Sequence, residues 1–227
     1  MDACNAETQQ TVRELASALL AQLHEQQQQQ RFIVAVAGTA GSGKTHLCGL
    51  IRDAANAGAS SDVCVVLPMD GFHLSKAQLT ELDDPALALR RRGAHWTFDA
   101  PGFAETVRRV RHRPTEVTLA PAFDHAAGDP VPCAIAVEPH HRLVLVEGLY
   151  AHAGEEPWAG AARLADERWW ISPRCPAASR SRLVRRHVRA GLAADDAAAE
   201  LRIAENDDLN SAFVMATRLP PTRIVPN

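Results

Sequence analysis

Hydrophobic residues along the chain follow two alternating patterns, which predict strands and helices in turn. Continuous apolar runs, typical of strands buried on both faces of a parallel sheet, occur at 32–37, 63–67 and 143–146. Shorter apolar runs at 169–171 and 224–225 are weaker strand candidates. Helical spacing of apolar residues fills the intervals 44–57, 75–92, 102–112, 177–190 and 195–217. Strands that alternate with helices predict an α/β fold with a mostly parallel central sheet.

Two segments fall outside this alternation. Residues 7–25 place Val12, Leu15 and Leu19 on one helical face, which predicts an amphipathic helix followed by a glutamine linker at 26–30. Residues 114–141 hold five prolines and two short β-prone pieces, and predict a small irregular, hairpin-like insertion beside the main sheet. We therefore expect one large domain over 31–227, with residues 1–30 as a helical extension.

Charge and cysteine content exclude several classes of protein. The 24 basic and 27 acidic residues give a net charge of −3, which argues against a nucleic-acid coat or a membrane-surface protein. Five scattered cysteines without a C-x-x-C pair form neither a disulfide framework nor a zinc knuckle. No apolar run approaches a membrane span, and no secretory signal is visible, so we expect a cytoplasmic protein.

The strongest chemical signal is a glycine-rich segment directly after the first predicted strand. Residues 38–45 fit G-x-x-x-x-G-K-[ST], the phosphate-binding loop of nucleotide-binding proteins, and a predicted helix follows. In such a loop Lys44 contacts the β- and γ-phosphates of ATP, and the Thr45 hydroxyl binds Mg²⁺. The residues expected around the phosphates are Gly38, Thr39, Ala40, Gly41, Ser42, Gly43, Lys44, Thr45 and His46. The motif predicts a three-layer P-loop NTPase fold.

Other motifs limit the type of P-loop protein. The N-K-x-D motif of GTPases and the L-S-G-G-Q motif of ABC ATPases are absent, which leaves a phosphotransferase or a stand-alone ATPase. Asp70 follows the second predicted strand, and ligands bind beyond the carboxyl ends of strands in open α/β sheets. A carboxylate there can accept a proton from a substrate hydroxyl and bind Mg²⁺ or its water. The alternative for Asp70 is a cap of the following helix.

Several segments in chain order resemble the small-molecule P-loop kinases, the group of uridine kinase, phosphoribulokinase and bacterial pantothenate kinase. Asp-Gly-Phe-His at 70–73 and Pro-Ala-Phe-Asp-His at 121–125 are similar to motifs of that group, as is Leu-Val-Leu-Val-Glu-Gly-Leu-Tyr at 143–150. Arg-Arg-Gly-Ala-His-Trp-Thr-Phe-Asp at 91–99 and Asn-Asp-Asp-Leu-Asn at 206–210 resemble a uridine-kinase-like or fructose-kinase-like subgroup. The resemblance extends from about residue 32 to residue 227.

The resemblance implies roles for further residues. Glu147 would assist Mg²⁺ or its waters; its alternative is a structural pair with an arginine. Asn210 would lie near the adenine. Residues 176–191 resemble the lid helix of the group, and helical spacing places their arginines near one face, where Arg182 and Arg186 are our candidates for stabilising the transferred phosphoryl group. A solvated basic face is the alternative.

Three segments should converge near Asp70 to bind the phosphate acceptor. The candidate contacts are His73, Arg92, His95, Trp96, Asp124 and His125, although a structural role is equally open for each histidine. We expect an ATP-dependent kinase that phosphorylates a hydroxyl of a nucleoside, a sugar or sugar acid, or a pantothenate-like alcohol. Uridine kinases usually have tyrosine where His73 stands, which argues against uridine itself. The alternative function is an ATP-binding regulatory or assembly protein; partners include neither nucleic acid nor membrane, and a homodimer is possible.

Overall fold

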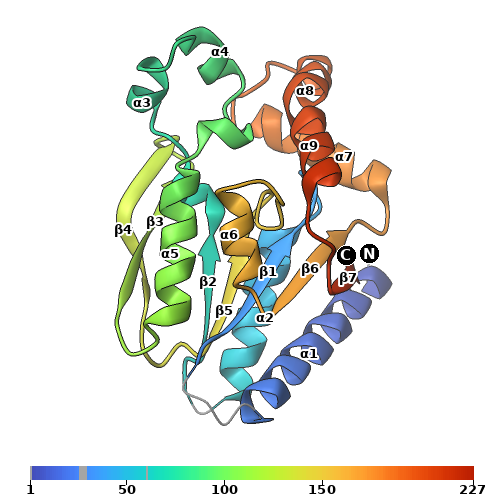
Figure 1. Cartoon of the computed structure of the whole chain (residues 1–227). Helices are drawn as coiled ribbons and strands as arrows, with labels where there is room; N and C mark the ends of the chain where they lie inside the picture. Colours follow the sequence, from blue (N-terminus) through green and yellow to red (C-terminus); the bar gives the residue numbers. More distant parts are fainter. Residues whose placement is uncertain (1, 26–29, 60) are drawn as a thin grey trace.

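The central sheet of the computed structural model has five parallel strands in the order β2-β5-β1-β6-β7 (Figure 1). The structure describes residues 2–25, 30–59 and 61–227, so four of the five residues of the predicted glutamine linker lie outside the described residues. The strands are β1 (Phe32–Ala37), β2 (Cys64–Pro68), β5 (Leu143–Glu147), β6 (Glu167–Ser172) and β7 (Arg223–Pro226). The predicted α/β class with a mostly parallel sheet is confirmed.

Side chains of the sheet alternate between two cores, one on each face. On β1, Ile33 and Ala35 join the core beneath α5 (Ala100–His112) and α6 (Trp158–Arg163), whereas Val34 joins the opposite core. That second core lies beneath α1 (Asp2–Glu25) and α2 (Lys44–Gly58). Helices on both faces of a parallel sheet give the three layers seen in Figure 1. Continuous apolar strands are buried on both sides for this reason.

The insertion is a two-stranded hairpin at one flank of the molecule, and its register shift between Ala120 and Ala122 confirms the predicted irregularity. Its strands β3 (Thr118–Asp124) and β4 (Asp129–Val137) pair antiparallel, with Thr118 opposite Val137 and Asp124 opposite Asp129. Both strands are longer than the two short pieces that the sequence predicted. The prolines made the predicted strands too short, because proline lacks an N–H group and weakens a strand signal. In a two-stranded sheet both strands are edges, where proline is tolerated, so the hairpin forms.

Two predicted helices are interrupted in the structure. The expected helix at 75–92 is two short ones, α3 (Lys76–Thr80) and α4 (Pro85–Arg90), because Ser75 and Asp84 each cap a new helix start. The expected helix at 195–217 comprises α8 (Asp196–Arg202), a π-helical turn η3 (Ile203–Asp207) and α9 (Asp208–Thr217). The remaining elements are η1 (Met69–Phe72), η2 (His95–Thr97) and α7 (Pro176–Arg189). The sequence did not predict α6.

The cysteines of known placement are unpaired, as the sequence indicated. Cys48 and Cys64 are buried, while Cys133 and Cys175 are exposed, and all four are free thiols. Within the described ranges, no helix has the length and hydrophobicity that a membrane span requires.

Candidate active site at the carboxyl edge of the sheet

The glycine-rich loop connects the end of β1 to the start of α2. Gly41 (φ 75°) and Gly43 (φ 84°) both adopt the left-handed backbone conformation, in which a side chain would be strained. This conformation explains why glycine stands at these two positions. Lys44 is the first residue of α2, so the ammonium group and the free N–H groups of the helix start lie at the same place.

Glu147 ends β5 beside this loop and is only 3% exposed. The Thr45 hydroxyl donates a hydrogen bond of 3.0 Å to its carboxylate. Burial raises the pKa of Glu147 to about 7, the negative charge of Asp70 adds to the rise, and the Lys44 ammonium opposes it. Among the described residues, no arginine forms an ion pair with Glu147, so the alternative structural pair is wrong.

Three side chains at this edge of the sheet supply oxygen ligands suited to a hard cation. The Thr45 hydroxyl and the two carboxylates of Asp70 and Glu147 are the donor types that Mg²⁺ prefers. A buried carboxylate with a raised pKa and no protein cation within 4.0 Å in the described chain would be stabilised by a metal ion. The residues present therefore fit a Mg²⁺ site.

Asp70 lies two residues beyond β2, in the short helical turn η1. Register pairs Pro68 at the end of β2 with Glu147 at the end of β5, which brings both carboxylates to one edge. The backbone carbonyl of Asp70 accepts hydrogen bonds from the backbone N–H of His73 (3.2 Å) and from its Nδ1 (2.8 Å). The cap of the next helix is Ser75 rather than Asp70. The capping alternative is therefore wrong, and the Asp70 carboxylate is not used for capping.

Helix α7 contacts the loop directly. The Ser179 hydroxyl donates a 2.6 Å hydrogen bond to the carbonyl of Gly41, and Nη2 of Arg182 lies 3.4 Å from the same oxygen. Beside these contacts, a cavity of about 250 Å³ lies between the loop and the helix. It is lined by Gly41, Gly43, Lys44, Thr45, His46, Arg182, Leu183 and Arg186. Fold and local geometry thus bring the two predicted arginines to the predicted phosphate loop.

The predicted acceptor histidines are packed in aromatic clusters. The His73 ring lies 4.0 Å from Phe98 and 4.9 Å from Phe123, centroid to centroid, and burial lowers its pKa. His95 stacks on Phe213 at 4.0 Å, and burial lowers its pKa also. Trp96 is 40% exposed. Both histidines are therefore favoured in the neutral form, and Trp96 remains accessible to a ligand.

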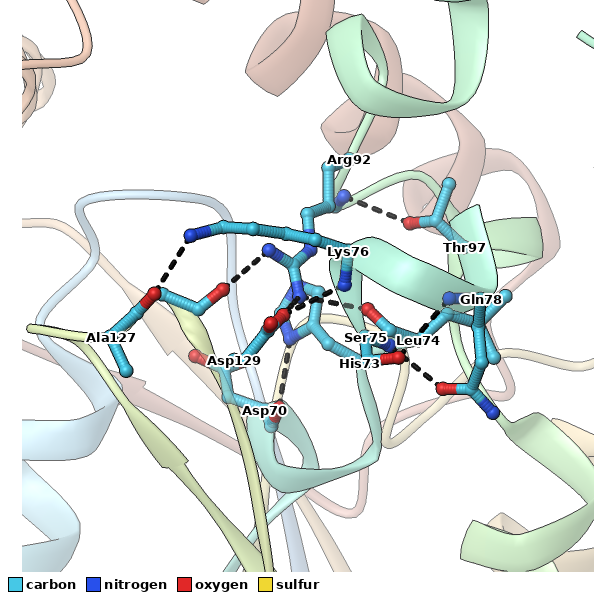
Figure 2. Close-up of polar contacts among 12 residues, drawn as sticks. Asp70, His73, Leu74, Ser75, Lys76, Gln78, Arg92, Thr97, Ala127 and Asp129 are labelled. Atoms are coloured by element: carbon cyan, nitrogen blue, oxygen red, sulfur yellow. Dashed lines mark hydrogen bonds and ion pairs between the residues drawn. The ribbon is translucent and has the colours of Figure 1, made fainter. Parts of the chain in front are cut away.

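Arg92 and Asp124 hold the turn of the β3–β4 hairpin, as Figure 2 shows for Arg92. The Arg92 guanidinium donates to the carbonyls of Leu74 (2.8 Å) and Gly128 (2.5 Å) and to the Asp129 carboxylate (2.7 Å). The Asp124 carboxylate accepts from two backbone N–H groups of the turn, at 2.8 and 3.1 Å. The sequence interpretation made both residues acceptor contacts, but their side chains bond the protein. Motif position alone does not show such partners.

Lys76 reinforces this attachment. Its ammonium donates to the carbonyl of Ala127 (2.7 Å), and its backbone N–H donates to Asp129 (2.9 Å) (Figure 2). The sequence alone indicates no role for this lysine. His125 follows Asp124 in the hairpin turn and is exposed. It faces α7 across a second cavity.

Asn210 lies apart from the loop cavity. Its side-chain oxygen accepts a 3.1 Å hydrogen bond from Arg91, whose Nε donates to Asn206 at 3.0 Å. Asn206 also donates to the carbonyl of Arg92 (3.0 Å). This cluster ties the turn η3 and α9 to the segment before η2. The adenine contact of Asn210 stays a prediction. No signal in the sequence distinguishes Arg91 from Arg92, because both stand in one run of arginines and their partners come from distant segments.

Comparisons with known proteins agree with this geometry. No family model matches the chain. The ATP-dependent kinase-like protein notR' of Aspergillus versicolor is 47% identical over 161 residues, covering 70% of this chain and 93% of the relative. C227.14 of Schizosaccharomyces pombe, named provisionally as a uridine kinase, is 39% identical over 193 residues, covering 85% and 82%. The structure of YFH7 from Saccharomyces cerevisiae has a TM-score of 0.85 at 20% identity, covering 95% and 98%, and shows the fold alone.

The relatives and the site lead to one assignment. The identity to notR' extends over nearly the whole of that protein, and the loop, the carboxylates and the arginine helix are the parts that phosphoryl transfer needs. The chain belongs to the family of ATP-dependent, uridine kinase-like P-loop kinases.

Proposed function

We propose that this kinase transfers the γ-phosphoryl group of ATP to a hydroxyl of a small metabolite, with Asp70 as the general base. One observation carries the proposal: one edge of the sheet brings together Lys44, Asp70 and Glu147. The charges of Lys44 and Asp70 both act there on the pKa of Glu147. A P-loop protein that uses ATP only as a regulatory switch has no need of a second carboxylate at this place. The alternative of an assembly protein receives no comparable support.

The donor side consists of the loop and α7. Backbone N–H groups of the loop and the Lys44 ammonium would bind the β- and γ-phosphates. Arg182 and Arg186 line the same cavity, and a planar guanidinium can stabilise the charge that spreads over the transferred phosphoryl group. Thr45, Asp70 and Glu147 would hold Mg²⁺, which when bound neutralises phosphate charge.

Asp70 would act on the acceptor side. Its carboxylate can accept the proton of the substrate hydroxyl as the oxygen attacks phosphorus. The hydrogen bonds from His73 to the Asp70 carbonyl fix the turn η1, so the carboxylate is presented from rigid backbone. The hairpin turn lies next to this segment because Lys76 and Arg92 bind it.

Helix α7 is suited to act as a lid. Leu183 and Val184 of α7 pack with Ala199 of α8 and Ile203 of η3 in a small core, separate from the two cores of the sheet. A unit with its own core can shift as a body relative to the sheet. Closure over bound ATP would exclude water from the phosphoryl group and limit hydrolysis.

Replacement of the proposed base tests this function. Asp70→Asn keeps the size of the side chain but removes the base, so we expect acceptor-dependent ADP release to fall by about 10²–10⁴-fold. Affinity for ATP measured without Mg²⁺ should change by less than about twofold, because the loop binds the phosphates. A screen of metabolites with ATP and Mg²⁺ supplies the acceptor.

The matched control is Asp83→Asn, at an exposed carboxylate between α3 and α4, which should leave turnover unchanged. ADP release that needs no acceptor and persists in Asp70→Asn would overturn the proposal.

A further inference from the structure

The arginines of α7 divide into two groups with different partners. Arg180 forms ion pairs with Glu200 (2.7 Å) and Asp208 (3.0 Å). The other four, Arg182, Arg185, Arg186 and Arg189, are exposed, and none forms an ion pair with a described residue. On an ordinary solvated face, basic residues are interspersed with acidic ones, as Arg180 is with Glu200 and Asp208. The unpaired group therefore needs another explanation.

These four arginines form two i,i+4 pairs on neighbouring parts of one helix face. The pair Arg182 and Arg186 lines the cavity of the phosphate loop. Both pairs line a second cavity of about 890 Å³ between α7 and the hairpin turn, together with His125, Ala126 and Ala190. Arg185 and Arg189 do not line the first cavity. No carboxylate is among the lining residues of the second.

Like charges held together repel, so four neighbouring guanidinium groups with no ion-paired acid among the described residues raise the energy of the empty site. An anion reverses this effect, and the planar fork of arginine binds phosphate or carboxylate with two parallel hydrogen bonds. The phosphates of ATP account for the pair that faces the loop. The second pair faces a volume large enough for a small metabolite of its own.

A chain of ring contacts connects the second cavity to the turn that holds the proposed base. His125 lies 5.2 Å from the Phe123 ring, and Phe123 lies 4.9 Å from the ring of His73, which bonds the carbonyl of Asp70. A ligand anchored at α7 and the hairpin turn would therefore extend toward Asp70.

We propose that the acceptor carries an anionic group of its own, a phosphate ester or a carboxylate, which Arg185, Arg189 and His125 bind. This proposal rests on the proposed kinase function and selects anionic over neutral alcohols as acceptors. The anionic group fixes one end of the acceptor, and its hydroxyl is presented to Asp70 at the other. Neutral nucleosides and neutral sugars would leave the second arginine pair unpaired.

The test uses protein saturated with Mg²⁺ and the non-hydrolysable analogue adenylyl imidodiphosphate, so that the donor site is filled. Inorganic phosphate and malonate are then titrated separately by calorimetry. We expect one of them to bind with a Kd of about 1–10 mM. The double variant Arg185→Gln/Arg189→Gln should weaken this binding at least about tenfold, and Arg180→Gln should change it less than about twofold. Stronger binding of phosphate indicates a phosphate ester, and stronger binding of malonate a carboxylate.

Affinity for the analogue itself separates the two arginine pairs. Arg182→Gln/Arg186→Gln should weaken it at least about tenfold, whereas Arg185→Gln/Arg189→Gln should leave it within about twofold. Circular dichroism confirms that each variant is folded.

The inference is overturned if neither anion binds below about 50 mM while the analogue is bound, or if loss of Arg185 and Arg189 leaves anion binding unchanged. Equal loss of analogue affinity in both double variants would also overturn it, because the second pair would then belong to the donor site. Asp70-dependent ADP release with a neutral acceptor would retain the kinase function and reject only the anionic acceptor.

Discussion

The two ends of the parallel strands treat positive charge in opposite ways. At the amino end, Arg31 is 1% exposed, and its guanidinium donates only to backbone carbonyls, 3.1–3.5 Å away. The acceptors are residues Val110, Arg113, Glu116, Val137, Glu138 and His141. At the carboxyl end, Lys44 forms no ion pair with any described residue within 4.0 Å. A cation bonded by the protein maintains the fold, whereas one without a protein partner at a strand end indicates an external anion.

Arg31→Met gives the largest expected effect. Methionine fills much of the volume but leaves six carbonyls at the junction of β1, α5 and the hairpin without their donor, so we expect a loss of about 3–5 kcal/mol in the free energy of unfolding. Urea denaturation measures this loss. Arg113→Gln, at an exposed surface ion pair, should cost less than about 0.5 kcal/mol. A loss below about 1 kcal/mol for Arg31→Met would mean that water replaces the guanidinium.

Lys44→Met tests the opposite end of the strands. Since the ammonium forms no ion pair within 4.0 Å with any described residue and acts on Glu147 only at longer range, its loss should change the free energy of unfolding by less than about 1 kcal/mol. Turnover should fall by about 10²–10³-fold, because one positive charge that faces the phosphates is removed. Lys76→Met, at the only other lysine of the chain, should leave ATP affinity unchanged, since that ammonium binds the hairpin turn. Equal loss of ATP affinity in both variants would contradict the contrast between the two lysines.

His152 is an intermediate case between these two extremes. It is fully buried; Nε2 donates to the carbonyl of Ala35 at 2.8 Å, while Nδ1 has no hydrogen-bond partner in the described part of the chain. Burial lowers its pKa from 6.5 to about 4, and the positive charges of Arg168 and Arg218 act in the same direction. The unfolded chain therefore binds this proton more readily than the native protein does. The contribution of neutral His152 to the free energy of unfolding is fully present above pH 6.5 and is lost as pH falls toward 4.

The shift corresponds to about 3 kcal/mol, lost between pH 6.5 and pH 4. Urea denaturation at a series of pH values in this window measures the slope. His152→Gln removes the titrating group, so its stability should vary less with pH over the same range. The control His112→Gln, at an exposed histidine of α5, should keep the wild-type slope. Identical slopes in wild type and His152→Gln would show that His152 is not buried neutral.

Features determined by neighbouring residues could be predicted from the sequence, whereas contacts between distant segments could not. Strands of the sheet were found because continuous apolar runs bury on both faces, and β1 has the predicted bounds at Phe32–Ala37. The loop and Glu147 were found because their chemistry is local to a strand end. Arg31 was missed because a single arginine before a strand has no pattern of its own.

Partners brought together by tertiary structure are the part of the site that the sequence did not predict. Arg92 and Asp124 stand in motifs, and a motif does not reveal that their polar atoms bond a hairpin turn. The break between α3 and α4 was missed because helical spacing outweighed the capping signals of Ser75 and Asp84. Sequence patterns thus located the elements and the loop, but contacts between distant segments required the structure.

Asp129→Ala gives the smallest expected effect and tests whether the hairpin turn is held as firmly as its contacts indicate. The Asp129 carboxylate accepts from the Arg92 guanidinium at 2.7 Å and from the backbone N–H of Lys76 at 2.9 Å. Because the carboxylate is one-third exposed, the loss should be modest, about 1 kcal/mol. Hydrogen exchange of the amides at 125–129 should therefore accelerate about fivefold, while the amides at the start of α2 keep their rate.

Asp129→Asn separates charge from hydrogen bonding in the same turn. Its amide oxygen can still accept from both donors, so exchange at 125–129 should accelerate less than in Asp129→Ala. Equal acceleration in the two variants would show that the charge of the ion pair, rather than its geometry, fixes the turn. Acceleration at the start of α2 as well would mean that the hairpin and the phosphate loop open together. The separate attachment of the turn to Lys76 and Arg92 implies that the acceptor side is structurally independent of the donor side. Joint opening would contradict that independence.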